Sequence, residues 1–290
     1  MLLNEMKNLK IAFSSCPNDT FMFHALVHGL VDAEGLAFDV EIHDVEELNK
    51  RAQYGCYDVS KLSYHGWFTV RDHYTMLSSG SALGWDCGPL LVRRAGDLSV
   101  LERTDLRIAV PGTYTTGALL CTLAYPGMGL QFPMLFSEIE SAVVRGDADL
   151  GVLIHEGRFT YRDKGLELVC DLGAWWQKSS ACPIPLGGIA VRTALGAEIA
   201  ASFDRALHRS ISYAFAHPEA SRDYVASYAR ELSAEVQQKH IDMFVNHFSL
   251  DLGTEGRRAV DALYERYERD YLRGGSEKVL SHGRQCGKST

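Results

Sequence analysis

An internal repeat most restricts what this chain can fold into. The segment from Glu47 to Val70 aligns without a gap on the segment from Glu138 to Tyr161, an offset of 91 residues. The matched residues are Glu47, Gly55, Asp58, Leu62, Gly66, Phe68 and Thr69 in the first copy and Glu138, Gly146, Asp149, Leu153, Gly157, Phe159 and Thr160 in the second. Any two strand–helix units share glycine caps and apolar strands, which is the alternative explanation. The gapless length of the match favours duplication.

Each copy predicts the same order of secondary structure. A helix ends at a glycine and a short apolar strand follows at once, over residues 59–63 in the first copy and 150–154 in the second. Upstream, residues 10–13 resemble residues 107–110 at an offset of 97, and a polar turn and a helix follow each. Short apolar runs that alternate with helical stretches indicate parallel βαβ units. We therefore predict an α/β fold with two similar lobes.

The second lobe is expected to be an insertion in the first. The apolar runs 90–93 and 188–192 bracket the second copy, and each follows a loop with glycine and proline, as expected for paired hinge strands. This predicts a large lobe of residues 1–93 and 192–290 and a small lobe of residues 94–191. Helices that cover the large lobe are expected at 197–216, 218–228, 233–246 and 254–271. The polar tail from Arg273 to Thr290 is expected to be disordered.

Composition excludes several classes of partner. The net charge is -8 and the 29 basic residues are scattered, so the chain lacks the basic patch that nucleic acid requires. No stretch reaches the roughly 18 apolar residues of a membrane span, and residues 1–10 lack the apolar core of a signal peptide. The seven cysteines include no C-x-x-C pair, which argues against a disulfide framework or a zinc site. We expect a cytoplasmic protein, and a homodimer is left open.

Four turns are expected to meet at one cleft, because ligands of open parallel sheets bind beyond the carboxyl ends of the strands. The turn 111–117 carries hydroxyls and the free N–H groups of a helix start, which can bind a carboxylate through Thr115, Thr116 and Gly117. The alternative is that one threonine merely caps the helix. The turn 14–20 contributes Asn18 and Asp19 as ligand-binding groups or as caps. The other two turns are Lys61 to Tyr64 in the first lobe and His155 to Arg158 in the second.

His155 is the predicted general base. It directly follows the apolar strand 150–154, at the rim of the expected cleft, and an ordinary histidine pKa near 6.5 suits proton transfer. Most histidines are nevertheless surface or core residues. Glu156 or Arg158 could orient His155 or bind substrate, although a solvated charge is the commoner role. Trp175 and Trp176 either line the cleft or pack in the core.

Several strings make the chain recognisable. It resembles the 1,4-dihydroxy-6-naphthoate synthase family of the futalosine route to menaquinone, from about Lys10 to Tyr271. The resemblance implies a periplasmic-binding-protein-like fold of type II, with two α/β lobes around a cleft. The strings that carry it are SSCPNDTF at 14–21, KLSY at 61–64, GSALG at 80–84, TT at 115–116, IHE at 154–156, RFTY at 158–161 and DLGAWW at 171–176.

The resemblance also implies an activity. The family cleaves cyclic dehypoxanthine futalosine into 1,4-dihydroxy-6-naphthoate and dihydroxyacetone, a carbon–carbon lyase reaction that uses no cofactor and no metal. His155 would be the proton acceptor. The ligand would be bound by Lys61, Leu62, Ser63, Thr115, Thr116 and Gly117. The repeat aligns His155 with Tyr64, so that one lobe would offer a hydroxyl to hold substrate and the other an imidazole to take its proton.

Two alternative functions stay open on the sequence. A solute-binding protein for a small carboxylate would have the same lobes and cleft, although the expected lack of an export signal argues against it. The dehydratase that acts on chorismate belongs to the same fold and pathway. Offering both substrates to the purified protein would separate the two enzymes.

Overall fold

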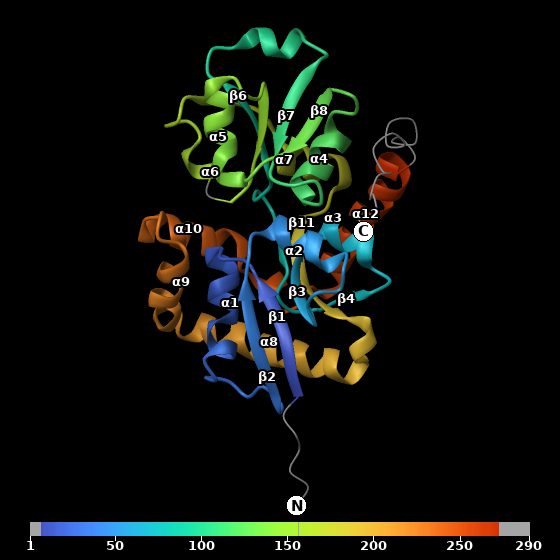
Figure 1. Cartoon of the computed structure of the whole chain (residues 1–290), viewed down its shortest axis with the longest axis vertical. Coiled ribbons are helices and arrows are strands. Elements are labelled where there is room, and N and C mark those ends of the chain that lie inside the picture. Colours follow the sequence, from blue (N-terminus) through green and yellow to red (C-terminus); the bar gives the residue numbers. More distant parts are fainter. Residues whose placement is uncertain (1–6, 156, 273–290) are drawn as a thin grey trace, which may run out of the picture.

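The computed structural model describes residues 7–155 and 157–272, which form two lobes, one above the other in Figure 1. The tail from Arg273 to Thr290 lies outside the described residues. The strands are β1 (Lys7–Phe13), β2 (Leu36–Ile42), β3 (Val59–Ser63), β4 (Tyr74–Met76), β5 (Ala82–Gly84), β6 (Leu90–Arg94), β7 (Leu106–Val110), β8 (Gly129–Pro133), β9 (Leu150–Leu153), β10 (Leu166–Asp171) and β11 (Ile184–Arg192).

The helices flank these strands and make up the carboxyl-terminal part of the described chain. They are α1 (Pro17–Val27), α2 (Val45–Ala52), α3 (Tyr64–Val70), α4 (Thr116–Ala124), α5 (Phe136–Arg145), α6 (Gly157–Thr160), α7 (Leu172–Ser180), α8 (Ala197–Ala216), α9 (Arg222–Tyr228), α10 (Ala234–Phe244), α11 (His247–Leu250) and α12 (Gly253–Arg266). Shorter turns are η1 (Leu98–Glu102), η2 (Thr193–Leu195), η3 (Pro218–Ser221) and η4 (Tyr267–Leu272).

The two lobes are built on one strand pattern. The first sheet has the order β2-β1-β3-β11-β4, with β5 also paired to β11, and the second has the order β8-β7-β9-β6-β10. In each sheet the first three strands are parallel, and the fourth runs antiparallel to the third. The α/β fold with two similar lobes, predicted from the repeat, is confirmed.

The repeat extends to the register of the strands. Ile11 pairs with Val59 across β1 and β3, and Ile108 pairs with Leu150 across β7 and β9. The offset of 97 residues carries Ile11 onto Ile108, and the offset of 91 carries Val59 onto Leu150. Both offsets found in the sequence therefore superimpose hydrogen-bonded partners, which supports duplication over chance similarity.

The fourth strand of each sheet is the first strand that the chain forms after it passes from the other lobe. Strand β6 pairs with β9 in the second sheet, and β11 pairs with β3 in the first. The expected boundaries, after residues 93 and 191, instead assign most of each strand to the opposite lobe. The predicted boundaries are wrong because the chain passes between the lobes before each of these strands and not after it. Each strand then pairs its backbone N–H and C=O groups with the sheet of the lobe that the chain has entered.

The carboxyl-terminal helices have two different positions. Helix α8 has the predicted bounds and packs with α1 in a cluster around Phe13, Phe203 and Ile211. Helix α12 and η4 instead contribute Leu263 and Tyr267 to a cluster that also contains Leu119 of α4. Both also pack on the first lobe, where Tyr264 and Tyr267 contact Phe68 of α3, so the prediction that these helices cover the first lobe is confirmed for them as well. They hold the two lobes together on one side.

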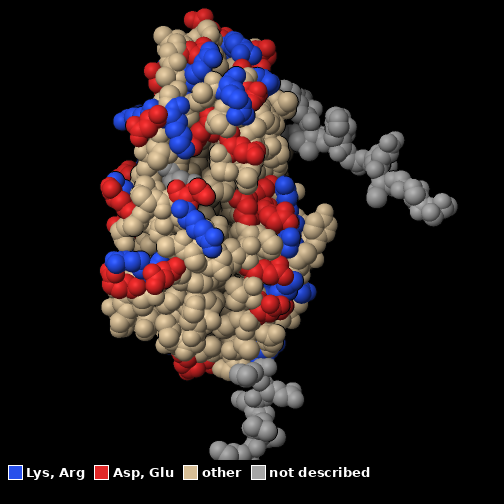
Figure 2. Space-filling model, turned by 60° about the vertical axis from the view of Figure 1, so that its left-hand side comes forward, with Lys and Arg blue, Asp and Glu red and all other residues tan. Residues whose placement is uncertain are grey.

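The surface carries charges of both signs. In Figure 2, Lys and Arg side chains lie among Asp and Glu side chains over the face that is drawn. Exposed ion pairs of this kind include Glu34 with Arg205 and Arg209, at 2.5 and 2.6 Å. Within residues 7–155 and 157–272, no helix has the length and apolar character needed to cross a membrane.

Candidate active site

A cleft between the lobes brings together most of the predicted site residues. It contains about 710 Å³ of space not filled by protein atoms, part of which is open to solvent. Eight of the nine predicted residues line it, namely Asn18, Asp19, Lys61, Ser63, Thr115, Thr116, Gly117 and His155. They come from both lobes, so a ligand in the cleft would contact both.

Leu62 and Tyr64 are turned away from the cleft. Leu62 is fully buried in a cluster with Val70 and Tyr74, because successive side chains of a strand point to opposite faces. The Tyr64 hydroxyl lies 2.9 Å from the Ser81 hydroxyl, and burial raises the pKa of Tyr64. The expected substrate contact of the Tyr64 hydroxyl is therefore wrong, since that group is engaged inside the core.

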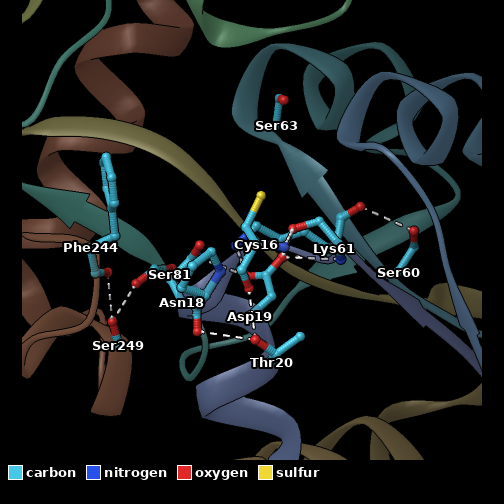
Figure 3. Close-up of polar contacts among 12 residues, drawn as sticks. Cys16, Asn18, Asp19, Thr20, Ser60, Lys61, Ser63, Ser81, Phe244 and Ser249 are labelled. Carbon is cyan, nitrogen blue, oxygen red and sulfur yellow. Dashed lines mark hydrogen bonds and ion pairs between the residues drawn. The ribbon is translucent and has the colours of Figure 1, made fainter. Parts of the chain in front are cut away.

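The floor of the cleft is a buried ion pair, drawn in Figure 3. Lys61 Nζ lies 2.7 Å from Asp19 Oδ1, and the side chains are 7% and 0% exposed. Asn18 Nδ2 donates to the same oxygen at 2.8 Å, while the Ser14 hydroxyl donates to Oδ2 at 2.7 Å. Asp19 thus accepts hydrogen bonds on both oxygens. The Lys61 charge is compensated within the protein and is a fixed part of the floor.

Asn49, which is not among the predicted site residues, positions Ser63. Asn49 Oδ1 accepts from the Ser63 N–H at 2.9 Å, and Nδ2 donates to Ser63 Oγ at 3.1 Å. Ser63 Oγ therefore accepts from Asn49, and the Ser63 O–H points away from Asn49. Gly66 makes room for this amide, because a Cβ there would lie 2.5 Å from Asn49 Oδ1. Asn49 could have been predicted from the sequence as a polar residue on the side of a helix that faces a strand.

The threonine turn offers backbone groups and not hydroxyls. Thr115 Oγ1 caps α4 by accepting from the Ala118 N–H at 3.3 Å, and Thr116 Oγ1 donates to the Leu186 carbonyl at 2.7 Å. The capping alternative is thus realised for Thr115. The N–H groups of Thr116 and Gly117 begin the helix, and none of the described residues accepts from them. Such groups form an anion site at a helix N-terminus.

His155 lies two residues after the end of β9 and contacts Cys16 and His240 of the first lobe. Its φ of 55° is in the left-handed region, which is uncommon for residues other than glycine. The Cys16 sulfur lies 3.6 Å from Nδ1 and 3.7 Å from Nε2, so it rests against the ring and is not in line with one nitrogen. The Phe136 ring meets the imidazole edge to face at 5.1 Å. This backbone conformation turns the imidazole into the cleft.

Arg158 lines the cleft and also holds neighbouring groups of the protein. Its guanidinium donates to the Gly88 carbonyl at 2.6 Å and to Asp171 Oδ2 at 2.7 Å. Asp171 also caps α7, so the pair fixes a chain crossing to the second lobe. The alternative assigned to Glu156 lies outside the described residues.

The two tryptophans support packing. Trp176 is fully buried and donates from Nε1 to the Pro183 carbonyl at 3.0 Å. Trp175 lies against Arg266, with the guanidinium carbon 5.6 Å from its ring centre. Neither residue lines the cleft. Of the two interpretations of the pair, simple packing is correct.

Glu46 joins the two lobes beside the cleft. Its Oε2 accepts from the N–H of Tyr114 at 3.1 Å, and a Cβ at Gly112 would lie 2.3 Å from the carboxyl carbon. Gly112 has a φ of 147°, a conformation that favours glycine. Burial raises the pKa of Glu46, against the opposing effect of the Tyr114 hydrogen bond. The contact therefore brings the threonine turn against α2 at the cost of a desolvated carboxylate.

The raised pKa of Glu46 predicts a pH dependence of stability. The folded protein binds the proton of Glu46 more tightly than the unfolded chain does, so the contribution of this residue to stability becomes less favourable over the pH range that begins at the ordinary value of 4.5 and ends above the raised pKa. We expect Glu46→Gln to gain a few degrees in Tm relative to the unmodified protein over that range. Thermal unfolding at several pH values measures it. Glu47→Gln is the control, because Arg51 lowers the pKa of Glu47 and the sign is reversed. A pH-independent difference for Glu46→Gln would contradict the assignment.

Two similar α/β lobes around a cleft define the class of two-lobed ligand-binding folds of the periplasmic-binding-protein type. The ligand-binding component of an ABC-type import system from Staphylococcus aureus has this fold, with a TM-score of 0.67 over 90% of this chain and 92% of its own, at 12% identity. A protein from Archaeoglobus fulgidus is closer, with a TM-score of 0.85 over 91% of this chain and 98% of its own, at 36% identity.

The family model described as menaquinone biosynthesis matches residues 9–269, and the chain belongs to this family. The 1,4-dihydroxy-6-naphthoate synthase of Thermus thermophilus is 44% identical over 95% of this chain and 99% of its own. The enzyme of the same name from Streptomyces coelicolor is 41% identical over 89% of this chain and 92% of its own.

Proposed function

We propose that this protein is a 1,4-dihydroxy-6-naphthoate synthase that cleaves cyclic dehypoxanthine futalosine into 1,4-dihydroxy-6-naphthoate and dihydroxyacetone. The observation that carries the proposal is the position of His155, an imidazole turned into an interlobe cleft by a left-handed backbone conformation. The names of the two relatives support the product, 1,4-dihydroxy-6-naphthoate. Because those relatives are biosynthetic enzymes, the proposal includes a cytoplasmic location.

The substrate carboxylate binds at the start of α4 in this proposal. The N–H groups of Thr116 and Gly117 donate to it, and the positive end of the helix dipole favours the negative charge. The Ser63 hydroxyl, held by Asn49, donates to a second oxygen of the substrate. The compensated Lys61 and Asp19 pair, with Asn18, forms a rigid floor beneath the ligand.

His155 supplies the acid–base chemistry. Its imidazole removes one acidic proton from the substrate, and the carbon–carbon bond to the three-carbon fragment then breaks in a retro-aldol-like step. The electron pair of that bond enters the ring system, which becomes aromatic. The imidazolium returns the proton, so atoms and electrons balance without a co-reactant. Hydrogen-bond donors in the cleft stabilise the oxyanion that develops.

The lobes act as two units that close on the ligand. We assign β6 to β10 with α7 to the unit that carries His155, and β1 to β5 with β11 to the unit that carries Ser63. Closure brings the base against the bound substrate and excludes water. The Glu46 contact with the turn of Tyr114 supports the closed arrangement.

The test is incubation of the purified protein with cyclic dehypoxanthine futalosine. Chromatography follows the release of 1,4-dihydroxy-6-naphthoate, and chorismate is offered in a parallel reaction. Release of the naphthoate is expected. Binding of the futalosine derivative without release would favour a solute-binding protein, and consumption of chorismate would favour the dehydratase; either result would overturn the proposal.

The contact between Cys16 and His155 predicts inhibition by thiol alkylation. Adding a carboxamidomethyl group to Cys16 would fill the space beside the imidazole, 3.6 Å away, and should remove more than about nine-tenths of the activity. Cys87 lines the cleft, but burial raises its pKa to about 12 and keeps the thiol unreactive. The measurement is residual activity after iodoacetamide treatment.

Two variants make this test specific. Cys16→Ser should be active and resistant to iodoacetamide. Cys56→Ser removes an exposed cysteine and should leave inhibition unchanged. Equal inhibition of the Cys16→Ser variant would show that another residue is responsible.

A further inference from the structure

His240 is a second histidine in the cleft, and the mechanism above does not use it. It lies on α10 of the first lobe and is completely buried, yet it forms part of the cleft wall. Neither ring nitrogen has a hydrogen-bond partner among the described residues. A buried polar group without a partner is costly, and native structures rarely keep one without a reason. The missing partner is therefore expected to come from the contents of the cleft.

The surroundings of His240 connect it to the reaction. Its ring lies 5.7 Å from that of His155, with an angle of 29° between the ring planes, although the two residues belong to opposite lobes. Phe244, one turn further along α10, also packs against His240, with 4.6 Å between ring centres. His240 is thus fixed by packing within reach of a ligand that contacts His155.

The charge state of His240 suits a hydrogen-bonding role. Burial lowers the pKa of His240 well below its ordinary value, and the nearby charges of His155 and Lys61 act in the same direction. The ring is neutral near pH 7 and therefore offers one N–H donor and one nitrogen acceptor. Of the two imidazoles, His155 transfers the proton, whereas His240 keeps its own.

We propose that His240 hydrogen-bonds to the substrate from the first-lobe wall, opposite His155, at a hydroxyl or carbonyl oxygen outside the carboxylate. This assignment rests on the proposed function. It makes the closed cleft a site in which imidazoles from both lobes contact one ligand. His240 then helps to select substrates that carry an oxygen at that position, because an analogue without it would leave the ring nitrogen unpaired.

Three substitutions test the proposal. His240→Leu removes both nitrogens and should lower kcat/KM by about 10–100-fold. His240→Asn places an amide near the position of Nδ1, and His240→Gln places one near Nε2. One of these two should recover at least about fivefold over the leucine variant, which identifies the nitrogen that contacts substrate. The control is His24→Leu, which removes a buried histidine that packs on Tyr224 outside the cleft.

The outcomes separate this inference from the proposed function. Turnover by the unmodified protein tests the function, while calorimetric titration with 1,4-dihydroxy-6-naphthoate measures binding for every variant. Weaker binding or lower kcat/KM in His240→Leu, with His24→Leu near normal, supports the role. Near-normal values in His240→Leu, or equal losses in all three variants with matching losses of Tm, overturn it. An unmodified protein that neither turns over the substrate nor binds the product overturns both proposals.

Discussion

Replacing His155 with asparagine is expected to lower turnover by about two to four orders of magnitude while folding and ligand binding stay near normal. The imidazole is the group at the end of β9 that can accept a proton at neutral pH and that faces the opposite lobe. Asparagine removes this basicity and keeps a polar side chain. It also tolerates the left-handed conformation that His155 adopts, with its φ of 55°. Steady-state kinetics and product binding measure the two effects separately.

The control for this variant is His208→Asn. His208 is exposed on α8, away from the cleft, and its replacement should leave both kcat and Tm unchanged. Turnover of the His155→Asn variant within about threefold of the unmodified protein would remove His155 from the role of base. A loss of product binding that matches the loss of turnover would instead assign it to binding.

Replacing Asp19 with asparagine is expected to lower the free energy of unfolding by about 3–5 kcal/mol, because it leaves Lys61 buried without its counter-charge. The Asp19 side chain is completely buried and lies 2.7 Å from Lys61 Nζ. The hydrogen bonds from Asn18 and the Ser14 hydroxyl also lose an ionised acceptor. Chemical denaturation followed by circular dichroism measures the change.

A double-mutant cycle separates the ion pair from the packing around it. Lys61→Met alone should also be destabilising, but Asp19→Asn combined with Lys61→Met should recover part of the loss, since no charge is left unpaired. Asp39→Asn, at an exposed position of β2, is the control with little expected effect. A loss below about 1 kcal/mol for Asp19→Asn would show that the pair is not the stabilising feature that its burial indicates.

Much of the fold could be predicted because each copy of the repeat is a short continuous segment. Each copy contains a helix, a glycine and a strand within one short segment, and the apolar pattern of such a segment reports its own structure. The pairing of Ile11 with Val59, and of Ile108 with Leu150, follows once two such segments are parallel. The position of the turns at the carboxyl ends of the strands then brings most of the predicted site residues to one cleft.

The remaining features depend on contacts between distant parts of the chain. Sequence alone does not state which sheet an apolar run such as β6 or β11 joins, since that depends on where the chain crosses. It also does not reveal that Thr116 donates to Leu186, which leaves backbone N–H groups for a ligand. One feature of the sequence does indicate that His240 is buried, because it lies on the same face of α10 as Gln237, Ile241 and Phe244.

Because β6 belongs to the second sheet and β11 to the first, the two similar lobes differ in the sequence separation of their paired strands, and therefore in the expected order of folding. All strands of the second sheet lie in one continuous segment, and Leu90 of β6 pairs with Leu153, 63 positions later. Ser63 of β3 pairs with Gly187, 124 positions later, so the first sheet stays incomplete until the whole second lobe has been synthesised. Contacts between distant residues form slowly because closing the intervening loop costs entropy. The unit that carries His155 is therefore expected to fold before the unit that carries Asp19 and Lys61.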